Sequence, residues 1–287
     1  MQALTVAVIG LGLMGGAIAR NLAAAGWRVT GIDPDPAAAQ RACENGVRLV
    51  DSVAALPRDV GLILTSLPDG DSLRATAQAL ARQTGFECVL AELSTLALHD
   101  KDGARDLLAP VGVAVLDCPI SGTGAQAVDG DLSIYASGER AAWDRVAHIF
   151  PAFARRPRYV GDFGTGTRLK YIANLLVAIH NVASAEAMAL AEAAGIDVAM
   201  AVEVLREGAG NSRIFELRAP LMARRCYEPA TMKLDVWAKD MQLIGDFARE
   251  RGARTPLFDA TVPVYESVRH ERPQQDTAAV FEALRRT

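Results

Sequence analysis

Lys170 and Asn174 are the two residues whose types and spacing best suit proton transfer. They lie four positions apart in the segment GTGTRLKYIAN, residues 164–174, and on a helix this spacing places both side chains on one face. Apolar neighbours such as Leu169 and Ile172 bring the lysine close to buried surface. In one interpretation, partial burial would lower the pKa of this amine, so that it could exchange a proton with an alcohol or a carbonyl. Spacing alone favours the alternative of a lysine at an exposed helix edge, where most lysines lie.

A second chemical signal is the glycine-rich turn GLGLMG, residues 10–15, between a short apolar run and a helical pattern. In such a turn the first glycine permits a tight bend, the second lets the backbone approach a pyrophosphate, and the third allows close helix–strand packing. The helix that follows offers unpaired N–H groups to the phosphates. An ordinary turn is the alternative, but the flanking elements favour a dinucleotide site. Its candidate residues are Gly10, Leu11, Gly12, Leu13, Met14 and Gly15.

Asp33 stands at the end of the second predicted strand. A carboxylate there can accept hydrogen bonds from the adenosine ribose of a dinucleotide, and it would repel a 2′-phosphate. The next residues, Pro34, Asp35 and Pro36, supply no cation for such a phosphate. The position therefore predicts NAD as the cofactor rather than NADP. Asp33 could also cap the helix that starts near Pro36, a role compatible with ribose binding.

A loop of small residues follows the predicted strand that ends at Asp117. Ser121, Gly122 and Thr123 can present hydroxyl and backbone N–H groups to an anion such as a substrate carboxylate. Taken alone, the segment favours an ordinary turn at a strand end.

The elements that must position these residues alternate along the first half of the chain. Because parallel strands need crossover helices, the alternation predicts an α/β, doubly wound sheet of the Rossmann type. Strands are predicted at residues 4–9, 28–32, 60–65, 88–92, 112–117 and 132–137, and helices at 15–25, 37–45, 70–81 and 98–108.

From residue 164 onward, apolar residues recur with the helical period and predict an all-α second domain. The breakers in GDFGTG, residues 161–166, divide the chain into a NAD-binding domain, 1–162, and a helical substrate and dimerisation domain, 163–287. The long first helix has more apolar surface than one small domain needs, so we expect a homodimer or homotetramer. Helices are predicted at residues 167–194, 199–206, 237–251, 256–271 and 278–284.

Composition excludes several classes of protein. Lys and Arg total 30 against 34 for Asp and Glu, a net charge of −4, which argues against nucleic-acid binding by bulk charge. The four cysteines are scattered and form no CxxC pair, so we expect them reduced and buried, with no metal site, in a cytoplasmic protein. No signal-peptide pattern is present, and charged residues interrupt the most apolar stretch, 171–205, so no membrane span is expected.

Four ordered motifs resemble the β-hydroxyacid dehydrogenase family, which includes 3-hydroxyisobutyrate, tartronate-semialdehyde and threonate dehydrogenases. They cover nearly the whole chain. The resemblance implies an NAD-dependent oxidoreductase that interconverts a small, carboxylate-bearing hydroxy acid and its semialdehyde or keto acid. The motifs are VIGLGLMG (8–15), DCPISGTGAQAVDG (117–130), GTGTRLKYIAN (164–174) and AKDMQLIGDFA (238–248).

The resemblance also implies roles for single residues. Lys170 matches the family's catalytic lysine, Asn174 the asparagine that holds the substrate beside it, and residues 121–123 the loop that binds the substrate carboxylate. Without the family, Lys239 would be interpreted as a solvated residue at a helix start. The further matches to cofactor-binding positions are Leu67, Pro68, Thr95 and Lys239.

Two features leave the exact substrate open. Thr123 replaces the second of two glycines that usually follow the family's serine, which narrows the pocket or adds a hydroxyl contact. The segment GAGNSRIFELRAP, residues 208–220, most resembles the threonate dehydrogenase branch. This makes Asn211 and Arg213, with Ser212 and Arg218, candidate substrate contacts, although an arginine there can equally form an ion pair.

Three other functions share this architecture. Imine reductases typically lack a lysine at the position of Lys170. The 6-phosphogluconate dehydrogenases are longer and have a histidine where this chain has Ala173. A non-catalytic dinucleotide-binding module is the third, but family members with scaffold roles have lost the lysine. Lys170 therefore favours the hydroxyacid dehydrogenase.

Overall fold

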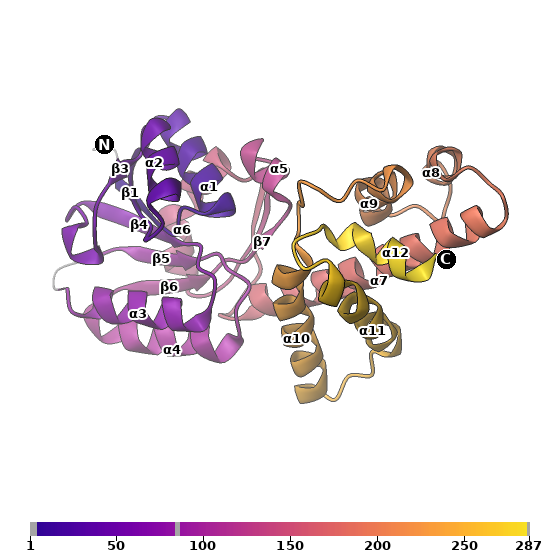
Figure 1. Ribbon diagram of the computed structural model, residues 1–287. Coiled ribbons are helices and arrows are strands. Elements are labelled where there is room, and N and C mark those ends of the chain that lie inside the picture. Colours follow the sequence, from indigo (N-terminus) through magenta and orange to yellow (C-terminus); the bar gives the residue numbers. More distant parts are fainter. Residues whose placement is uncertain (1–4, 84–86, 286–287) are drawn as a thin grey trace. The chain divides into compact units, whose positions relative to one another are not determined.

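A six-stranded parallel sheet is the centre of the first half of the chain (Figure 1). Its strands are β1 (Thr5–Ile9), β2 (Arg28–Ile32), β3 (Arg48–Leu49), β4 (Val60–Thr65), β5 (Val89–Glu92) and β6 (Ala114–Asp117). The computed structural model describes residues 5–83 and 87–285, so the predicted strand start at residue 4 lies outside the described residues. The strand order, β3-β2-β1-β4-β5-β6, reverses direction between β1 and β4. In open α/β sheets, ligands bind at the carboxyl ends of strands beside such a switch point. The predicted Rossmann-type sheet is confirmed.

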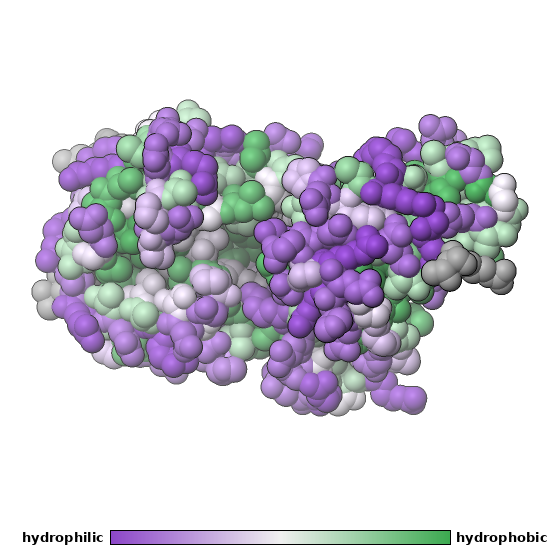
Figure 2. All heavy atoms as spheres, viewed as in Figure 1, coloured by the Kyte–Doolittle hydropathy of each residue, from purple (hydrophilic) through white to green (hydrophobic). Residues whose placement is uncertain are grey.

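Both faces of the sheet are apolar and covered by helices. In β1, Val6 and Val8 pack into one hydrophobic cluster and Ala7 and Ile9 into another, because successive strand residues point to opposite faces. The first cluster is covered by α1 (Leu13–Ala24), α2 (Pro36–Glu44) and α6 (Arg140–Val146), and the second by α3 (Gly70–Ala81) and α4 (Leu98–Leu108) (Figure 1). Where the helices face solvent, the view in Figure 2 shows many hydrophilic residues.

A second, three-stranded sheet lies beyond the end of β6. It consists of β7 (Ile120–Ser121), β8 (Ser133–Ala136) and β9 (Arg156–Tyr159), with α5 (Gly124–Val128) between its first two strands. The expectation that residues 132–137 extend the parallel sheet is wrong, because β8 pairs antiparallel with β7. Only two residues separate β6 from β7, too few for β7 to become a parallel neighbour of β6, which needs a connection of about a dozen or more. β7 therefore starts a separate sheet, and β8 pairs with it there.

The chain forms two compact units, Met1–Lys170 and Tyr171–Thr287, which divide within α7 (Thr165–Ala193). The predicted domain boundary after residue 162 falls between β9 and α7. Among the described residues, α7 is the one helix long and apolar enough to cross a membrane by length and composition, a property that core helices of soluble proteins share. The helices after it are α8 (Val198–Leu205), α9 (Arg213–Arg224), α10 (Leu234–Glu250), α11 (Pro256–Glu271) and α12 (Phe281–Leu284), with a 3-10 turn at Thr277–Val280.

The sequence pattern does not predict α9, although it is twelve residues long. Pro220 lies inside this helix, and a proline normally ends a helical pattern because it lacks an N–H donor. The Ser212 hydroxyl caps the helix start by accepting a hydrogen bond from the Phe215 N–H at 3.0 Å. Tertiary packing of the apolar face therefore outweighs the local signal.

The expectation that all four cysteines are buried is wrong for Cys43 and Cys226, which are exposed. Cys43 follows Ala42, which lies on the buried face of α2, and so turns toward solvent. Cys88 and Cys118 are buried, and burial raises the pKa of both thiols, that of Cys88 to about 11.

Candidate active site

The glycine loop connects β1 to α1, and two of its glycines are required by the fold. Gly10 has a φ of +90°, and a Cβ on it would lie 2.1 Å from the carbonyl oxygen of Ser66. A Cβ on Gly15 would lie 1.9 Å from the carbonyl oxygen of Gly10. Both contacts join backbone to backbone, so neither position has room for a side chain.

Gly12 differs from both, because a Cβ there would have no heavy atom within 4 Å. Its backbone is extended and precedes the first helical residue of α1, a conformation that alanine also adopts. None of the described residues therefore requires a glycine here, whereas a pyrophosphate that lies against the backbone does. The first N–H groups of α1, which have no partner within the helix, begin at the same place. The loop thus fits the phosphates of a dinucleotide.

The other loop residues have different surroundings. Leu11 is buried in the core, Leu13 is 67% exposed, and Met14 is partly buried. The Leu11 N–H donates a hydrogen bond to Asp33 Oδ2 at 2.5 Å. The loop is therefore tied to the end of β2 through the carboxylate predicted to bind ribose.

Asp33 is half-buried, and each of its carboxylate oxygens accepts one backbone hydrogen bond. Oδ1 accepts from the Asp35 N–H at 2.8 Å, opposite the bond from Leu11. The interpretation of Asp33 as the cap of α2 is wrong, because Asp35 caps that helix by accepting from the Ala37 N–H. A carboxylate has about four acceptor sites, so two remain for ribose hydroxyls.

The ends of β4 and β5 are joined by a side chain that the sequence analysis did not single out. The Ser94 hydroxyl accepts a hydrogen bond from the Leu67 N–H at 2.8 Å. Pro68 follows Leu67 and Thr95 follows Ser94. The structure thus brings together the segments that hold three of the predicted cofactor-binding residues.

The small-residue loop at Ser121–Thr123 has a defined conformation. Gly122 has a φ of +152°, and a Cβ on it would meet the Leu132 side chain at 2.7 Å. Thr123 forms a capping box with Gln126. Its hydroxyl accepts from the Gln126 N–H at 3.3 Å, and Gln126 Oε1 accepts from the Thr123 N–H at 3.0 Å. This cap explains why a threonine can replace the family's glycine.

The helix that follows this loop, α5, lies against α1. Asn21 Nδ2 donates to the carbonyl oxygen of Ala127 at 2.8 Å, and a Cβ on Gly124 would lie 2.8 Å from the Leu13 side chain. The predicted substrate loop and the glycine loop are therefore neighbours within the first unit.

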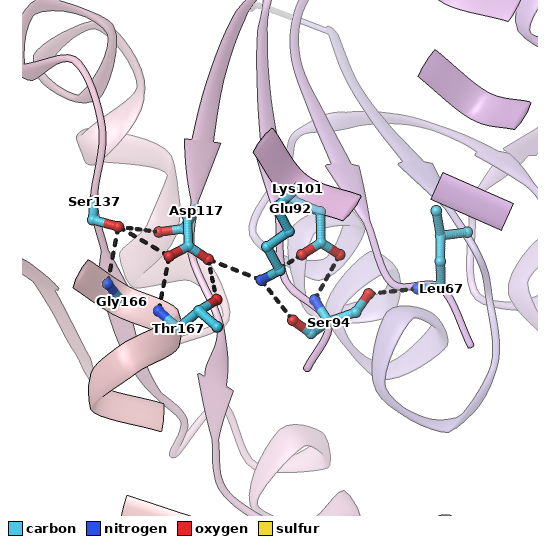
Figure 3. Close-up of polar contacts among 8 residues, drawn as sticks. All are labelled: Leu67, Glu92, Ser94, Lys101, Asp117, Ser137, Gly166 and Thr167. Carbon is cyan, nitrogen blue, oxygen red and sulfur yellow. Dashed lines mark hydrogen bonds and ion pairs between the residues drawn. The ribbon is translucent and has the colours of Figure 1, made fainter. Parts of the chain in front are cut away.

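The start of α7 is bound by two side chains from the sheets (Figure 3). Asp117, at the end of β6, accepts from the Thr167 N–H at 2.8 Å and from the Thr167 hydroxyl at 2.7 Å. The Ser137 hydroxyl accepts from the Gly166 N–H at 3.0 Å. Lys170 follows three residues later and is buried. The expectation that this lysine lies near buried surface is confirmed.

Lys101, on α4, is completely buried and binds the same strand ends (Figure 3). Its Nζ lies 2.6 Å from Glu92 Oε2 and 2.8 Å from Asp117 Oδ1, and it donates to the carbonyl oxygen of Ser94 at 2.8 Å. Burial alone would lower the pKa of Lys101, but the two carboxylates outweigh it and hold that pKa above its ordinary value. The two carboxylates therefore favour the charged form of Lys101.

In the second unit, Asn174 is buried and its Nδ2 donates to Asp240 Oδ2 at 2.9 Å. Lys239 is 39% exposed, and its Nζ lies 3.9 Å from Asp240 Oδ1. Asp240 stands in the fourth sequence motif, beside the lysine that the family match selects. The structure thus adds Asp240 as the partner of Asn174.

The two candidate contacts from residues 208–220 meet at one carboxylate. Asn211 Nδ2 and Arg213 Nη1 each lie 2.8 Å from an oxygen of Glu216, in the first turn of α9. The bonds from Asn211 and Arg213 lower the pKa of Glu216. Arg218 is buried, and its Nη1 donates to both oxygens of Asp276 at 2.8 Å. This ion pair gives Arg218 a partner within the chain, so its presence needs no substrate contact.

The sequence contains only part of the signal for the missed residues. Glu92 and Asp117 each end an apolar run, the position where a parallel sheet collects functional groups. Lys101 lies in an ordinary helical pattern, and nothing local distinguishes it from an exposed lysine.

Comparison with known proteins gives matches over both units. Residues 5–161 match the family model for the NAD-binding domain of 6-phosphogluconate dehydrogenase. Residues 164–284 match the model described as the NAD-binding region of NADP-dependent 3-hydroxyisobutyrate dehydrogenase.

Individual relatives agree with these models. An L-threonate dehydrogenase of Haemophilus influenzae is 31% identical over 86% of this chain and 84% of its own. The structure of a 3-hydroxyisobutyrate dehydrogenase from Salmonella typhimurium is 27% identical, with a TM-score of 0.86 over 98% of this chain and 99% of its own. The Mycobacterium tuberculosis 3-hydroxyisobutyrate dehydrogenase with L-serine is 26% identical, with a TM-score of 0.89 over 99% and 100%.

The contrast between Gly12 and Gly15 gives a direct test of the loop. Gly12→Ala should fold normally, since its Cβ meets no atom, but should weaken NADH binding by roughly tenfold or more, about 1.4 kcal/mol. Gly15→Ala should lose stability first, by roughly 1–3 kcal/mol or more, because its Cβ overlaps a backbone oxygen. Thermal unfolding and NADH fluorescence titration measure the two effects. A Gly12→Ala protein that binds NADH like the wild type would show that no phosphate lies on this backbone.

Proposed function

We propose that this chain, which belongs to the β-hydroxyacid dehydrogenase family, oxidises the hydroxyl group of a small hydroxy acid reversibly, with NAD preferred and Lys170 as general acid and base. The observation that carries the proposal is the buried Lys170 on a helix whose start is bound to a strand end of a dinucleotide fold. The substrate class follows the relatives, threonate and 3-hydroxyisobutyrate dehydrogenases.

Bound NAD would supply the hydride acceptor. The glycine loop and the start of α1 would hold its pyrophosphate, and Asp33 its adenosine ribose. Leu67, Pro68 and Thr95 would line the nicotinamide end, and the family match adds Lys239 as a further cofactor contact. The room at Gly12 and the two acceptor sites left on Asp33 support this arrangement.

The substrate carboxylate would bind at Ser121, Gly122 and Thr123. The Thr123 hydroxyl and N–H both take part in the capping box, so we assign the anion contacts mainly to Ser121 and to the backbone of Gly122. The neutral amine of Lys170 would accept the proton of the substrate hydroxyl while hydride leaves the carbon that carries it. In the reverse direction the ammonium group would return that proton to the new alkoxide.

Asn174 would orient the substrate hydroxyl one helical turn from Lys170. One N–H of its amide is bound to Asp240, which fixes the side chain and leaves the carbonyl oxygen and second N–H for substrate and lysine. Asn211 and Arg213 remain candidates for the distal end of a longer substrate such as threonate.

We also propose a cytoplasmic homo-oligomer with small-molecule partners. Exposed apolar residues on α7, Ile172, Leu176 and Leu190, support a subunit contact along this helix.

The function and the role of Lys170 can be tested together. We expect turnover with NAD in a screen of C3–C6 hydroxy acids that includes threonate, glycerate and 3-hydroxyisobutyrate. On the best substrate, Lys170→Ala should lower kcat by about 10²–10⁴, the usual range for a lost general acid–base. NADH affinity should stay near that of the wild type. Lys170→Arg should recover little, since guanidinium stays protonated.

Two outcomes would contradict the proposal. Reduction of cyclic imines without turnover of any hydroxy acid would favour an imine reductase. A Lys170→Ala enzyme that keeps more than about a tenth of the wild-type kcat would remove the general acid–base role.

Cofactor preference is tested separately at Asp33. The wild type should bind NADH more tightly than NADPH, because the carboxylate repels a 2′-phosphate. Asp33→Ser combined with Pro34→Arg should weaken or reverse this preference. In this variant, kcat with NAD should fall by a smaller factor than the affinity for NADH. A wild-type enzyme that prefers NADP at equal concentration would overturn the assignment.

A further inference from the structure

Lys101 is unusual among the basic residues of this chain. Only four of the 30 are lysines, at positions 101, 170, 233 and 239, and the other 26 are arginines. Lys101 is among the largest fully buried side chains. A compact ammonium group has three donors, and at the ends of β5 and β6 it donates hydrogen bonds to Ser94 and Asp117 and forms an ion pair with Glu92 (Figure 3). The planar fork of an arginine would not fit this arrangement.

The oxygens that Lys101 holds belong to groups that bind further elements. Glu92 Oε1 accepts from the Ser94 N–H at 2.8 Å, and the Ser94 hydroxyl accepts from the Leu67 N–H. Asp117 accepts both bonds from Thr167, and the Ser137 hydroxyl lies 3.1 Å from its Oδ2. A continuous set of bonds thus runs from the loop after β4 to the first turn of α7.

Such a cluster is a costly way to stabilise a fold. It contains two carboxylates and one ammonium group, all essentially removed from solvent, and well-packed apolar residues are often as stable or more so. The positive end of the α7 dipole, which points at Asp117, offsets part of the excess negative charge. What an apolar core cannot supply is a fixed direction for each bonded group, which argues for a role in positioning.

We propose that Lys101 is a positioning residue for the dehydrogenase reaction. Through Asp117 and Thr167 it sets the place of the first turn of α7, and so of Lys170. Through Glu92 and Ser94 it sets the loop at Leu67, where the nicotinamide end of the cofactor is proposed to lie. The inference rests on the proposed function, because it holds that this cluster sets the distance between the base, Lys170, and the nicotinamide that accepts the hydride.

Thr167 offers the sharpest test, since its hydroxyl can be removed without changing any charge. Thr167→Val keeps the shape and the N–H bond to Asp117 but loses the hydroxyl bond, whereas Thr167→Ser keeps the hydroxyl and loses a methyl group. If the bond positions Lys170, the valine variant should lose about 10–100-fold in kcat, because a shift of about 1 Å has that effect. The KM for substrate and the dissociation constant for NADH should change by less than about threefold, and the serine variant should resemble the wild type.

Thr261→Val is the matched control. Thr261 is also buried, on α11, but among the described residues its hydroxyl donates to the carbonyl oxygen of Phe258 in its own helix and not to another element. Its kcat should stay at the wild-type level. A Thr167→Val enzyme as active as the wild type, with a weaker Thr167→Ser, would mean that Thr167 only fills space, and would overturn the proposal.

Lys101 itself is tested by the double variant Lys101→Met with Glu92→Gln, which removes one charge of each sign and leaves the net charge of the cluster unchanged. The expected result is again a fall in kcat whose fold-change is larger than the fold-change in KM. If this variant does not fold, the comparison of Thr167→Val with Thr167→Ser still tests the proposal.

A readout that needs no turnover separates this inference from the proposed function. With four lysines in the chain, mass spectrometry can follow the rate at which acetic anhydride modifies Lys170. That rate should change severalfold in Thr167→Val and stay near the wild type in Thr167→Ser and Thr261→Val. Equal rates in all four proteins would overturn the positioning role. Failure of the wild type to oxidise any hydroxy acid would instead contradict the proposed function alone.

Discussion

The ammonium group of Lys101 lies between the carboxyl ends of two parallel strands and binds an oxygen from each of three residues there. Parallel strands bring all their carboxyl ends to one edge of a sheet, which is where a doubly wound fold places its ligand site. The same geometry gathers carboxylates that would repel each other without a counter-ion. The charged form of Lys101 lets Glu92 and Asp117 remain there as hydrogen-bond acceptors, and the conformations of the Leu67 loop and the α7 start depend on those acceptors.

The glycines of the glycine loop have different structural reasons for being glycine. Gly10 and Gly15 are fixed by the approach of backbone to backbone, so their smallness serves the fold. Gly12 faces open space, so none of the described residues requires its smallness, and the proposed pyrophosphate contact does. Thr123 is the converse case, because a position where the family usually has glycine is occupied by a helix cap. The chain thus keeps glycine where a ligand or the backbone needs it and replaces it where a hydroxyl stabilises a short helix.

Local patterns predict much of this structure. The glycine loop, the place of Asp33 at the end of β2, and the position of Lys170 and Asn174 on one helix depend on spacings of a few residues. Strands β1, β2, β4, β5 and β6 are found because both faces of the sheet are apolar, whereas the exposed two-residue strand β3 is not predicted. In the separate sheet, β8 is predicted as a strand but assigned to the parallel sheet, and β7 and β9 are not predicted. β7 has only two residues, and β9, with the sequence RPRY, has no apolar run. The positioning contacts escape for another reason. Asp117 meets Lys101 across 16 positions and Thr167 across 50, and Asn174 meets Asp240 across 66. Nothing in one sequence indicates which polar residues the fold will pair over such separations.

Nuclear magnetic resonance of the lysine side chains tests the central claim, that one buried and permanently charged ammonium group holds the strand ends together. With ¹⁵N label at the four lysine Nζ atoms, the spectrum of the intact protein should contain one slowly exchanging NH₃⁺ signal. At about pH 8, exposed lysines remain protonated but exchange their protons rapidly with water, so this signal should stand alone, and Lys101→Met with Glu92→Gln should remove it. The account would be contradicted if all four groups exchanged rapidly, or if the Lys101 signal titrated to the neutral amine near neutral pH.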